Sequence, residues 1–273
     1  MENNFLMILH VIQKNNYDIK GYNAKDIIDK TLPLIGHHDP KFRDDLIYPV
    51  LAHLFHDKHL NEVDLENYLD LLISDDYLCY DFENKESYSA LKRSFTVLQL
   101  VIICFVHRRD RIIKEDKINH LLKRFLDYYR EESILTGYAP QVGWIHTIAH
   151  SADLFAQLLQ VEHFKKKDIL NIFNAIQQKM MNDQHDFICN EDERSVVAIK
   201  KTLDLNRLSQ DEIQSWLDGF IIKDKEMIYP NKMILENNIK RFLRSLYFSL
   251  YKEEKYQEIM KHIEHVLEEN QKR

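Results

Sequence analysis

The residues best suited to chemistry lie between Trp144 and Asp153. Read as a helix, this segment brings His146, His150 and Asp153 onto one face, because positions i, i+4 and i+7 fall within about 60° of each other around a helix. Two imidazoles one turn apart are a recurring metal-binding spacing, and a carboxylate completes a two-His-one-carboxylate donor set. The spacing therefore makes His146, His150 and Asp153 candidate ligands for a divalent metal ion.

The same helix face also has interpretations without a metal. A solvated helix side carries histidine and aspartate without any function, and Asp153 can hydrogen-bond or ion-pair with His150. The face could equally bind a ligand or take part in catalysis without a metal. Trp144 is expected on the opposite, apolar face. A thermolysin-like peptidase is excluded, because Thr147 stands where the zincin motif requires a glutamate after the first histidine.

The amino-acid composition predicts the secondary structure that holds these side chains. Glycine and proline number five each among 273 residues, well below average usage of about 7% and 5%. Many-stranded β architectures and phosphate-binding loops need glycine at positive φ, so the deficit predicts an all-α fold. A hydrophobic content of 45% is enough to build a sizeable core, which excludes disorder of the whole chain.

Apolar residues recur every three or four positions, which predicts about a dozen antiparallel helices joined by short polar segments. Asp39-Pro40 has the residues of a helix start, with a capping side chain ahead of a proline. Later helices are expected near residues 63–73, 86–106, 114–129, 144–160, 167–181, 192–203, 210–220, 231–251 and 256–269. This order favours an α-α superhelix, a HEAT-like solenoid, over an irregular bundle.

The segment Gly137 to Gly143 is the strongest internal boundary, because it holds two glycines and a proline. It is too short and too apolar to act as a free linker. We therefore expect a single all-helical domain over residues 1–273, with an internal joint near 137–143.

Charge and cysteine usage limit the partners and the compartment. A net charge of −7 with dispersed basic residues indicates no nucleic-acid partner. Cys79, Cys104 and Cys189 form no disulfide or zinc pattern, which fits a reducing cytoplasm. The apolar run Val97–Val106 is about half the length of a membrane span, so we expect a buried core helix and no membrane association.

Two further clusters have structural explanations. Asn190 is expected to cap a helix whose first turn carries Glu191, Asp192 and Glu193, since acidic side chains are favourable near a helix N-terminus. His37-His38-Asp39 resembles a metal-binding sequence, yet Asp39 is already explained as a cap and the histidines as loop residues.

Several of these residues resemble the motifs of an uncharacterised bacterial family, a domain of unknown function. The resemblance lies in Gly36-x-x-Asp39-Pro40-x-x-Arg43-Asp44, Arg93-Ser94-Phe95, Glu132, Gly143-Trp144-x-His146-x-x-Ala149-His150-x-Ala152-Asp153 and Glu191-Asp192-Glu193-Arg194. It implies an all-helical, HEAT-like superhelix and names no activity. The family's pattern has Asp-x-Arg-Gly where this chain has Ile134-Leu135-Thr136-Gly137, so a family activity that used those side chains would be lost or changed here.

Two functions follow from these residues. The leading interpretation is a cytoplasmic helical-repeat protein that acts as a binding module for a protein or small ligand. Its concave face would present Trp144, His146, His150, Asp153, Glu132, Glu193 and Arg194. The alternative is a metal-dependent enzyme of hydrolase or oxygenase type, with His146, His150 and Asp153 as ligands and Glu132 or Glu193 as base.

Overall fold

The structure, a computed structural model, describes residues 2–224 and 226–272. Helices dominate it, which confirms the predicted all-α fold class. The helices are α1 (Glu2–Lys14), α2 (Ala24–Thr31), α3 (Pro40–Phe42), α4 (Tyr48–His56), α5 (Glu62–Leu72), α6 (Ala90–Asp110), α7 (Glu115–Glu131), α8 (Thr147–Leu158), α9 (Lys166–Met180), α10 (Glu191–Asp204), α11 (Gln210–Asp218), α12 (Asn231–Leu250) and α13 (Gln257–Glu269). Shorter elements are the 3-10 turns η1 (Leu32–Leu34), η3 (Ser87–Ser89) and η4 (Glu254–Tyr256), the π-helical turn η2 (Arg43–Ile47), and the strands β1 (Tyr138–Ala139) and β2 (Gly143–Trp144).

The chain divides into two compact units, residues 1–154 and 155–273. The joint expected at residues 137–143 is occupied by a β-hairpin of the first unit, in which Tyr138 pairs with Trp144 and Ala139 with Gly143. The prediction of a single domain over residues 1–273 stays a prediction.

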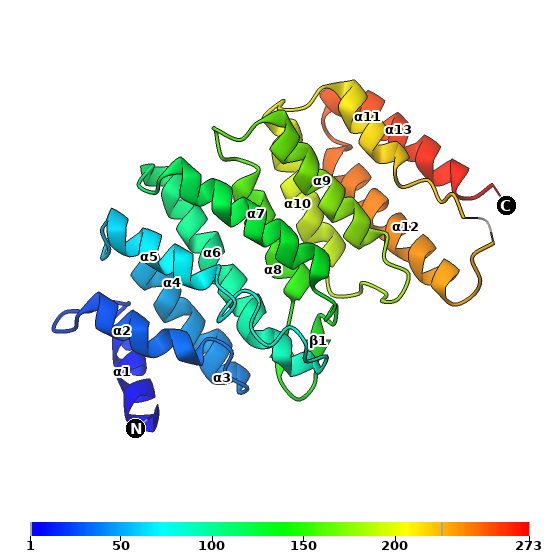
Figure 1. The fold of residues 1–273 in the computed structure, drawn as a ribbon. Coiled ribbons are helices and arrows are strands. Elements are labelled where there is room, and N and C mark those ends of the chain that lie inside the picture. Colours follow the sequence, from blue (N-terminus) through cyan, green and yellow to red (C-terminus); the bar gives the residue numbers. More distant parts are fainter. Residues whose placement is uncertain (1, 225, 273) are drawn as a thin grey trace. The chain divides into compact units, whose positions relative to one another are not determined.

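In the first unit, α4 and α5 both pack against α6, and α7 packs on α5 (Figure 1). Helix α6 contains the apolar run predicted to be a core helix. It is long and apolar enough to cross a membrane by composition alone, yet 78% of its most apolar 18-residue window is buried within the fold. Burial of that extent is what a core helix shows.

In the second unit, α10 packs against α12, and α11 packs against α13. Trp216 of α11 is buried, and its indole N–H donates to the carbonyl of Phe173 at 2.9 Å. Its ring meets the ring of Phe242 edge-on, with centroids 6.1 Å apart. Packing between helices two apart in the sequence is common in stacked helical repeats, and the HEAT-like superhelix stays a prediction.

The predicted helix start at Asp39-Pro40 is confirmed. The Asp39 carboxylate accepts the backbone N–H of Lys41 at 2.9 Å, and Pro40 occupies the first helical turn. The α-helical geometry lasts only through α3, and the π-helical turn η2 separates it from α4. π-Helical turns occur frequently at functional sites. The turn η2 begins at the buried Arg43.

Candidate functional site

The chain turns sharply at His146, so the helix predicted from Trp144 begins later than expected. His146 has a φ of +53°, α8 begins at Thr147, and Trp144 belongs to β2. The backbone N–H groups of Ile145 and His146 both donate to the carbonyl of Gly137, at 2.8 and 3.2 Å. These bonds tie both residues to the hairpin. The predictions that His146 lies within the helix and that Trp144 lies on its apolar face are therefore wrong.

Three aromatic side chains gather where the hairpin meets α8. The imidazole of His146 stacks on the indole of Trp144, with ring centroids 4.4 Å apart and planes 4° from parallel. Tyr138, directly across the hairpin, meets the same indole edge-on at 4.9 Å. Tyr138 and Trp144 are each 47% exposed. We call Tyr138, Trp144 and His146 the aromatic platform.

His150 lies next to this platform, with its ring centroid 5.4 Å from that of His146. It is buried, so the expectation of a solvated helix face is wrong at this position. Its Nδ1 lies 2.8 Å from the hydroxyl and 3.3 Å from the carbonyl of Ser94. A carbonyl can only accept, and the hydroxyl of Ser94 donates to the carbonyl of Ile145, so the geometry assigns a proton to Nδ1. In the neutral ring, Nε2 then keeps the lone pair.

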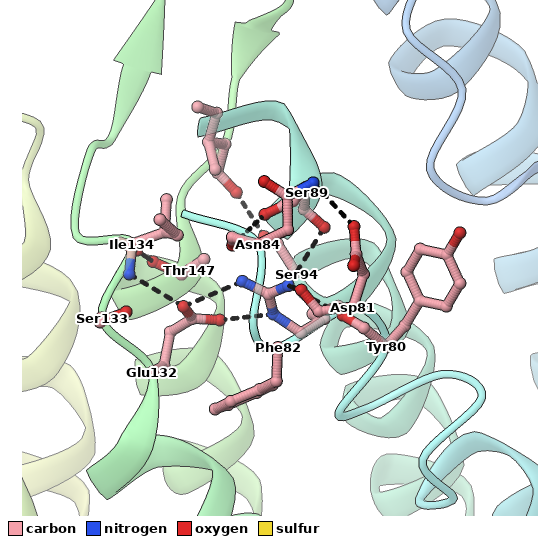
Figure 2. A network of polar contacts seen from close by, with 12 residues as sticks. Tyr80, Asp81, Phe82, Asn84, Ser89, Ser94, Glu132, Ser133, Ile134 and Thr147 are labelled. Carbon is pink, nitrogen blue, oxygen red and sulfur yellow. Dashed lines mark hydrogen bonds and ion pairs between the residues drawn. The ribbon is translucent and has the colours of Figure 1, made fainter. Parts of the chain in front are cut away.

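A buried ion pair joins α6 to the end of α7. Nε and Nη2 of Arg93 donate to the two carboxylate oxygens of Glu132 at 2.8 and 3.1 Å, and both side chains are at most 2% exposed. Nη1 of Arg93 donates to the carbonyls of Tyr80, Asp81 and Ser89, at 2.8, 3.3 and 3.2 Å. Figure 2 shows Glu132 on one side of this guanidinium and the Tyr80–Asp81 backbone on the other. Glu132, proposed from sequence as a base, therefore has a structural partner.

The same carboxylate positions the segment that leads into the hairpin. The backbone N–H of Ile134 donates to Glu132 at 2.9 Å, and the hydroxyl of Thr147 donates to the carbonyl of Ile134 at 2.5 Å (Figure 2). The Ile134 side chain is buried in a small apolar cluster with Val142 and Ile145. Ile134 thus contributes to packing, and Thr136 is half-buried.

A second buried guanidinium anchors the other end of the hairpin. Nη2 of Arg43 donates to the carbonyls of Val142 and Trp144, at 2.8 and 3.2 Å, while Nε donates to Asp44 at 2.8 Å. The guanidinium also lies over the ring of Phe95, 4.7 Å from its centroid. Burial lowers the pKa of Arg43, and the neighbouring Asp44 opposes that shift. The arginine therefore fixes the backbone on which the platform stands.

The remaining candidates are placed as follows. Asp153 lies half-buried on α8, three residues after His150. Glu193 is exposed and Arg194 is half-buried, and both lie on α10 of the second unit. Their convergence with the histidines stays a prediction. Among the described residues, no group of three or more His, Cys, Asp and Glu side chains is arranged to hold a metal ion.

The start of α10 differs from the prediction. Asn190 has a φ of +65° and its side chain makes no capping bond, because a capping residue needs an extended backbone. Glu191 is buried instead, and its Oε2 accepts the backbone N–H of Cys189 at 2.8 Å. Burial raises the pKa of Glu191, although this backbone bond opposes the shift. The expected cap at Asn190 is therefore wrong.

Comparison with known families identifies the relatives of this chain. The family model described as Protein of unknown function (DUF2785) matches residues 78–248, which is more than half of the chain. The chain belongs to the DUF2785 family. Neither the curated proteins nor the solved structures contain a match to it. The DUF2785 match includes the platform and the Arg93–Glu132 ion pair, whereas Arg43 precedes it.

Sequence reasoning did not single out Tyr138, Arg43, Arg93 or Ser94 as candidate site residues. Arg93 carried a signal, because a basic residue within a strongly apolar helix needs a buried partner. Arg43 and Ser94 bind backbone carbonyls of residues 142–145, about 50 to 100 positions away in the chain. No spacing rule connects residues so far apart. Tyr138 became visible only through its pairing with Trp144 in the hairpin.

Proposed function

We propose that this member of the DUF2785 family is a binding module that recognises another protein through the aromatic platform. The observation that carries the proposal is the exposure of Tyr138 and Trp144, each 47% accessible, on a hairpin held by buried polar contacts. Tryptophan and tyrosine are enriched among the residues that dominate protein–protein binding energy. His146, which is half-buried, adds a third flat ring to this surface.

Buried hydrogen bonds hold the backbone of the platform before any partner binds. Arg43 holds the backbone of Val142 and Trp144, and Ser94 holds the backbone of Ile145. A surface fixed in advance loses less conformational entropy on binding, which increases affinity without any additional contact. The buried residues around the platform therefore have a function in recognition although they do not touch the partner.

The geometry favours binding over the metal-dependent enzyme. Both carboxylate oxygens of Glu132 are engaged by Arg93. Glu132 therefore has a structural partner at the position where an enzyme would need a base. As part of the same proposal, the protein acts in the cytoplasm and its partner is neither a nucleic acid nor a membrane.

Site-specific photocrosslinking tests the proposal. A photoreactive phenylalanine derivative replaces Tyr138 in one variant and Tyr22 in another, because Tyr22 is also exposed, at 40%, and lies outside the platform. In a native lysate, we expect a specific protein to crosslink from position 138 and not from position 22. Equal crosslinking from both positions, or none from position 138, would overturn the proposal.

A further inference from the structure

A cleft of about 300 Å³ opens in the first unit, apart from the residues of the aromatic platform. Three segments line it: η1 with the loop that follows it, the segment between α5 and α6, and the first turn of α6. Among its lining residues are His37, His38, Tyr80, Asp81, Tyr88 and Lys92. This volume is at the lower end of the range for small-molecule sites, which is roughly 300 to 1,000 Å³.

The cation in this cleft has aromatic neighbours in place of a carboxylate. Nζ of Lys92 lies 4.4 Å from the ring centroid of Tyr77 and 4.2 Å from that of Tyr80. Within the described residues, no carboxylate lies at ion-pair distance from it. Burial lowers the pKa of Lys92, with Asp76 opposing the shift. By contrast, Nζ of Lys117 lies 2.5 Å from the carboxylate of Asp70.

The walls of the cleft are fixed by buried contacts. Gly36 lies so close to α6 that a Cβ atom there would come within 2.8 Å of the Lys92 backbone. On the other side, Arg93 holds the carbonyls of Tyr80 and Ser89. The loop that contains Gly36 and the segment between α5 and α6 are therefore both held against α6, the helix from which Lys92 extends. A preformed cleft with a partly desolvated cation has a low reorganisation cost for binding an anion.

The remaining polar groups of the cleft fit the same chemistry. The rings of His38 and Tyr88 lie 5.5 Å apart by centroids and provide flat surfaces and hydrogen-bond donors. Asp81 is the carboxylate in the lining, and its Oδ2 accepts a hydrogen bond from the side chain of Asn84 at 2.9 Å. The carboxylate of Asp81 is thus engaged by Asn84, whereas the ammonium group of Lys92 lies over the rings of Tyr77 and Tyr80.

We propose that this cleft binds a small molecule through an anionic phosphate or carboxylate group, with Lys92 as the cation that holds it. The aromatic side chains would contact the uncharged body of the molecule. This site is independent of the platform and of the protein partner proposed above.

Thermal unfolding with defined anions tests the site. The unfolding temperature of the purified full-length protein is measured against increasing inorganic phosphate, pyrophosphate and citrate, with sodium chloride at matched ionic strength as reference. Phosphate and citrate stabilise many proteins nonspecifically, so Lys117→Gln, which removes the same charge elsewhere, is the control. Comparing the responses to phosphate and pyrophosphate with the response to citrate distinguishes a site for a phosphate group from a site for a carboxylate group.

We expect at least one of these anions to raise the unfolding temperature of the wild-type protein saturably. Lys92→Gln should weaken the apparent affinity about tenfold or more, because a charge-assisted hydrogen bond is lost. Lys92→Arg should retain most of the effect, and Lys117→Gln should behave like the wild type. Absence of a saturable response to all three anions, or an unchanged response in Lys92→Gln, would overturn the proposal.

Discussion

The imidazole of His146 lies flat on the indole of Trp144, with ring centroids 4.4 Å apart and planes 4° from parallel. This contact exists because the backbone turns at His146, where φ is +53°, instead of continuing as a helix. Non-glycine residues in this conformation are uncommon and often occur at functional positions. The stacked pair thus combines an unusual backbone with exposed ring surface, and it is the centre of the proposed binding surface.

Fluorescence quenching can test the exposure of the platform. The chain has two tryptophans, of which Trp144 is 47% exposed and Trp216 is 4% exposed. Because acrylamide quenches accessible indoles, Trp144→Phe should remove most of the quenchable emission and leave the shielded emission of Trp216. If the emission left in Trp144→Phe were quenched as efficiently as that of the wild type, the described exposure would be wrong.

The buried ion pair predicts a large stability difference between two substitutions. Glu132→Gln leaves the Arg93 guanidinium buried without its counter-charge, which costs about 3–5 kcal/mol in comparable sites. Asp70→Asn breaks the partly exposed pair with Lys117 and should cost about 1 kcal/mol or less. Urea unfolding of both variants measures the two values. Similar losses for both would contradict the structural role of Glu132.

Two glycines allow the hairpin geometry to be tested separately from backbone strain. Gly143 and Gly21 both have positive φ, at +76° and +89°. A Cβ atom on Gly143 would lie 3.3 Å from Pro40, whereas one on Gly21 would have no neighbour within 4 Å. Gly21→Ala should therefore cost about 1 kcal/mol from backbone strain alone. Gly143→Ala should cost more, as measured by urea unfolding, and an equal cost would mean that the contact with Pro40 contributes nothing.

Helix content was predictable because it depends on local pattern, while the site depended on distant contacts. The apolar period and the cap at Asp39 predicted where most helices lie. The helix start at Trp144 was predicted wrongly, since the hydrogen bonds from residues 145 and 146 to Gly137 override helical spacing. The contacts of Arg43 with Val142 and Trp144 cross about 100 residues, and only the folded chain reveals them.

The pKa of Asp204, in the second unit, predicts that the stability of the protein depends on pH. Burial alone would raise its pKa, but hydrogen bonds from Tyr256, Lys200 and Lys255 lower it from 3.8 to about 2. A lowered pKa in the folded state stabilises the protein fully above the unfolded value, and this contribution is lost as the pH falls toward 2.

Asp204→Asn should therefore destabilise the protein near neutral pH, by less than about 1 kcal/mol because the side chain is 40% exposed and screened by solvent. The difference from the wild type should shrink between about pH 4 and pH 2. Urea unfolding at a series of pH values gives this difference. A difference that stays constant across the series would show that the Asp204 carboxylate does not titrate as described.

Loss of partner binding by Trp144→Ala is the most direct test of the binding module. With the partner identified by crosslinking from position 138, its dissociation constant is measured for the wild type, Trp144→Ala and Tyr22→Ala, after thermal unfolding has confirmed that all three are folded. We expect Trp144→Ala to bind about tenfold or more weakly and Tyr22→Ala to bind like the wild type. Equal binding by Trp144→Ala and the wild type would contradict the role of the platform in recognition.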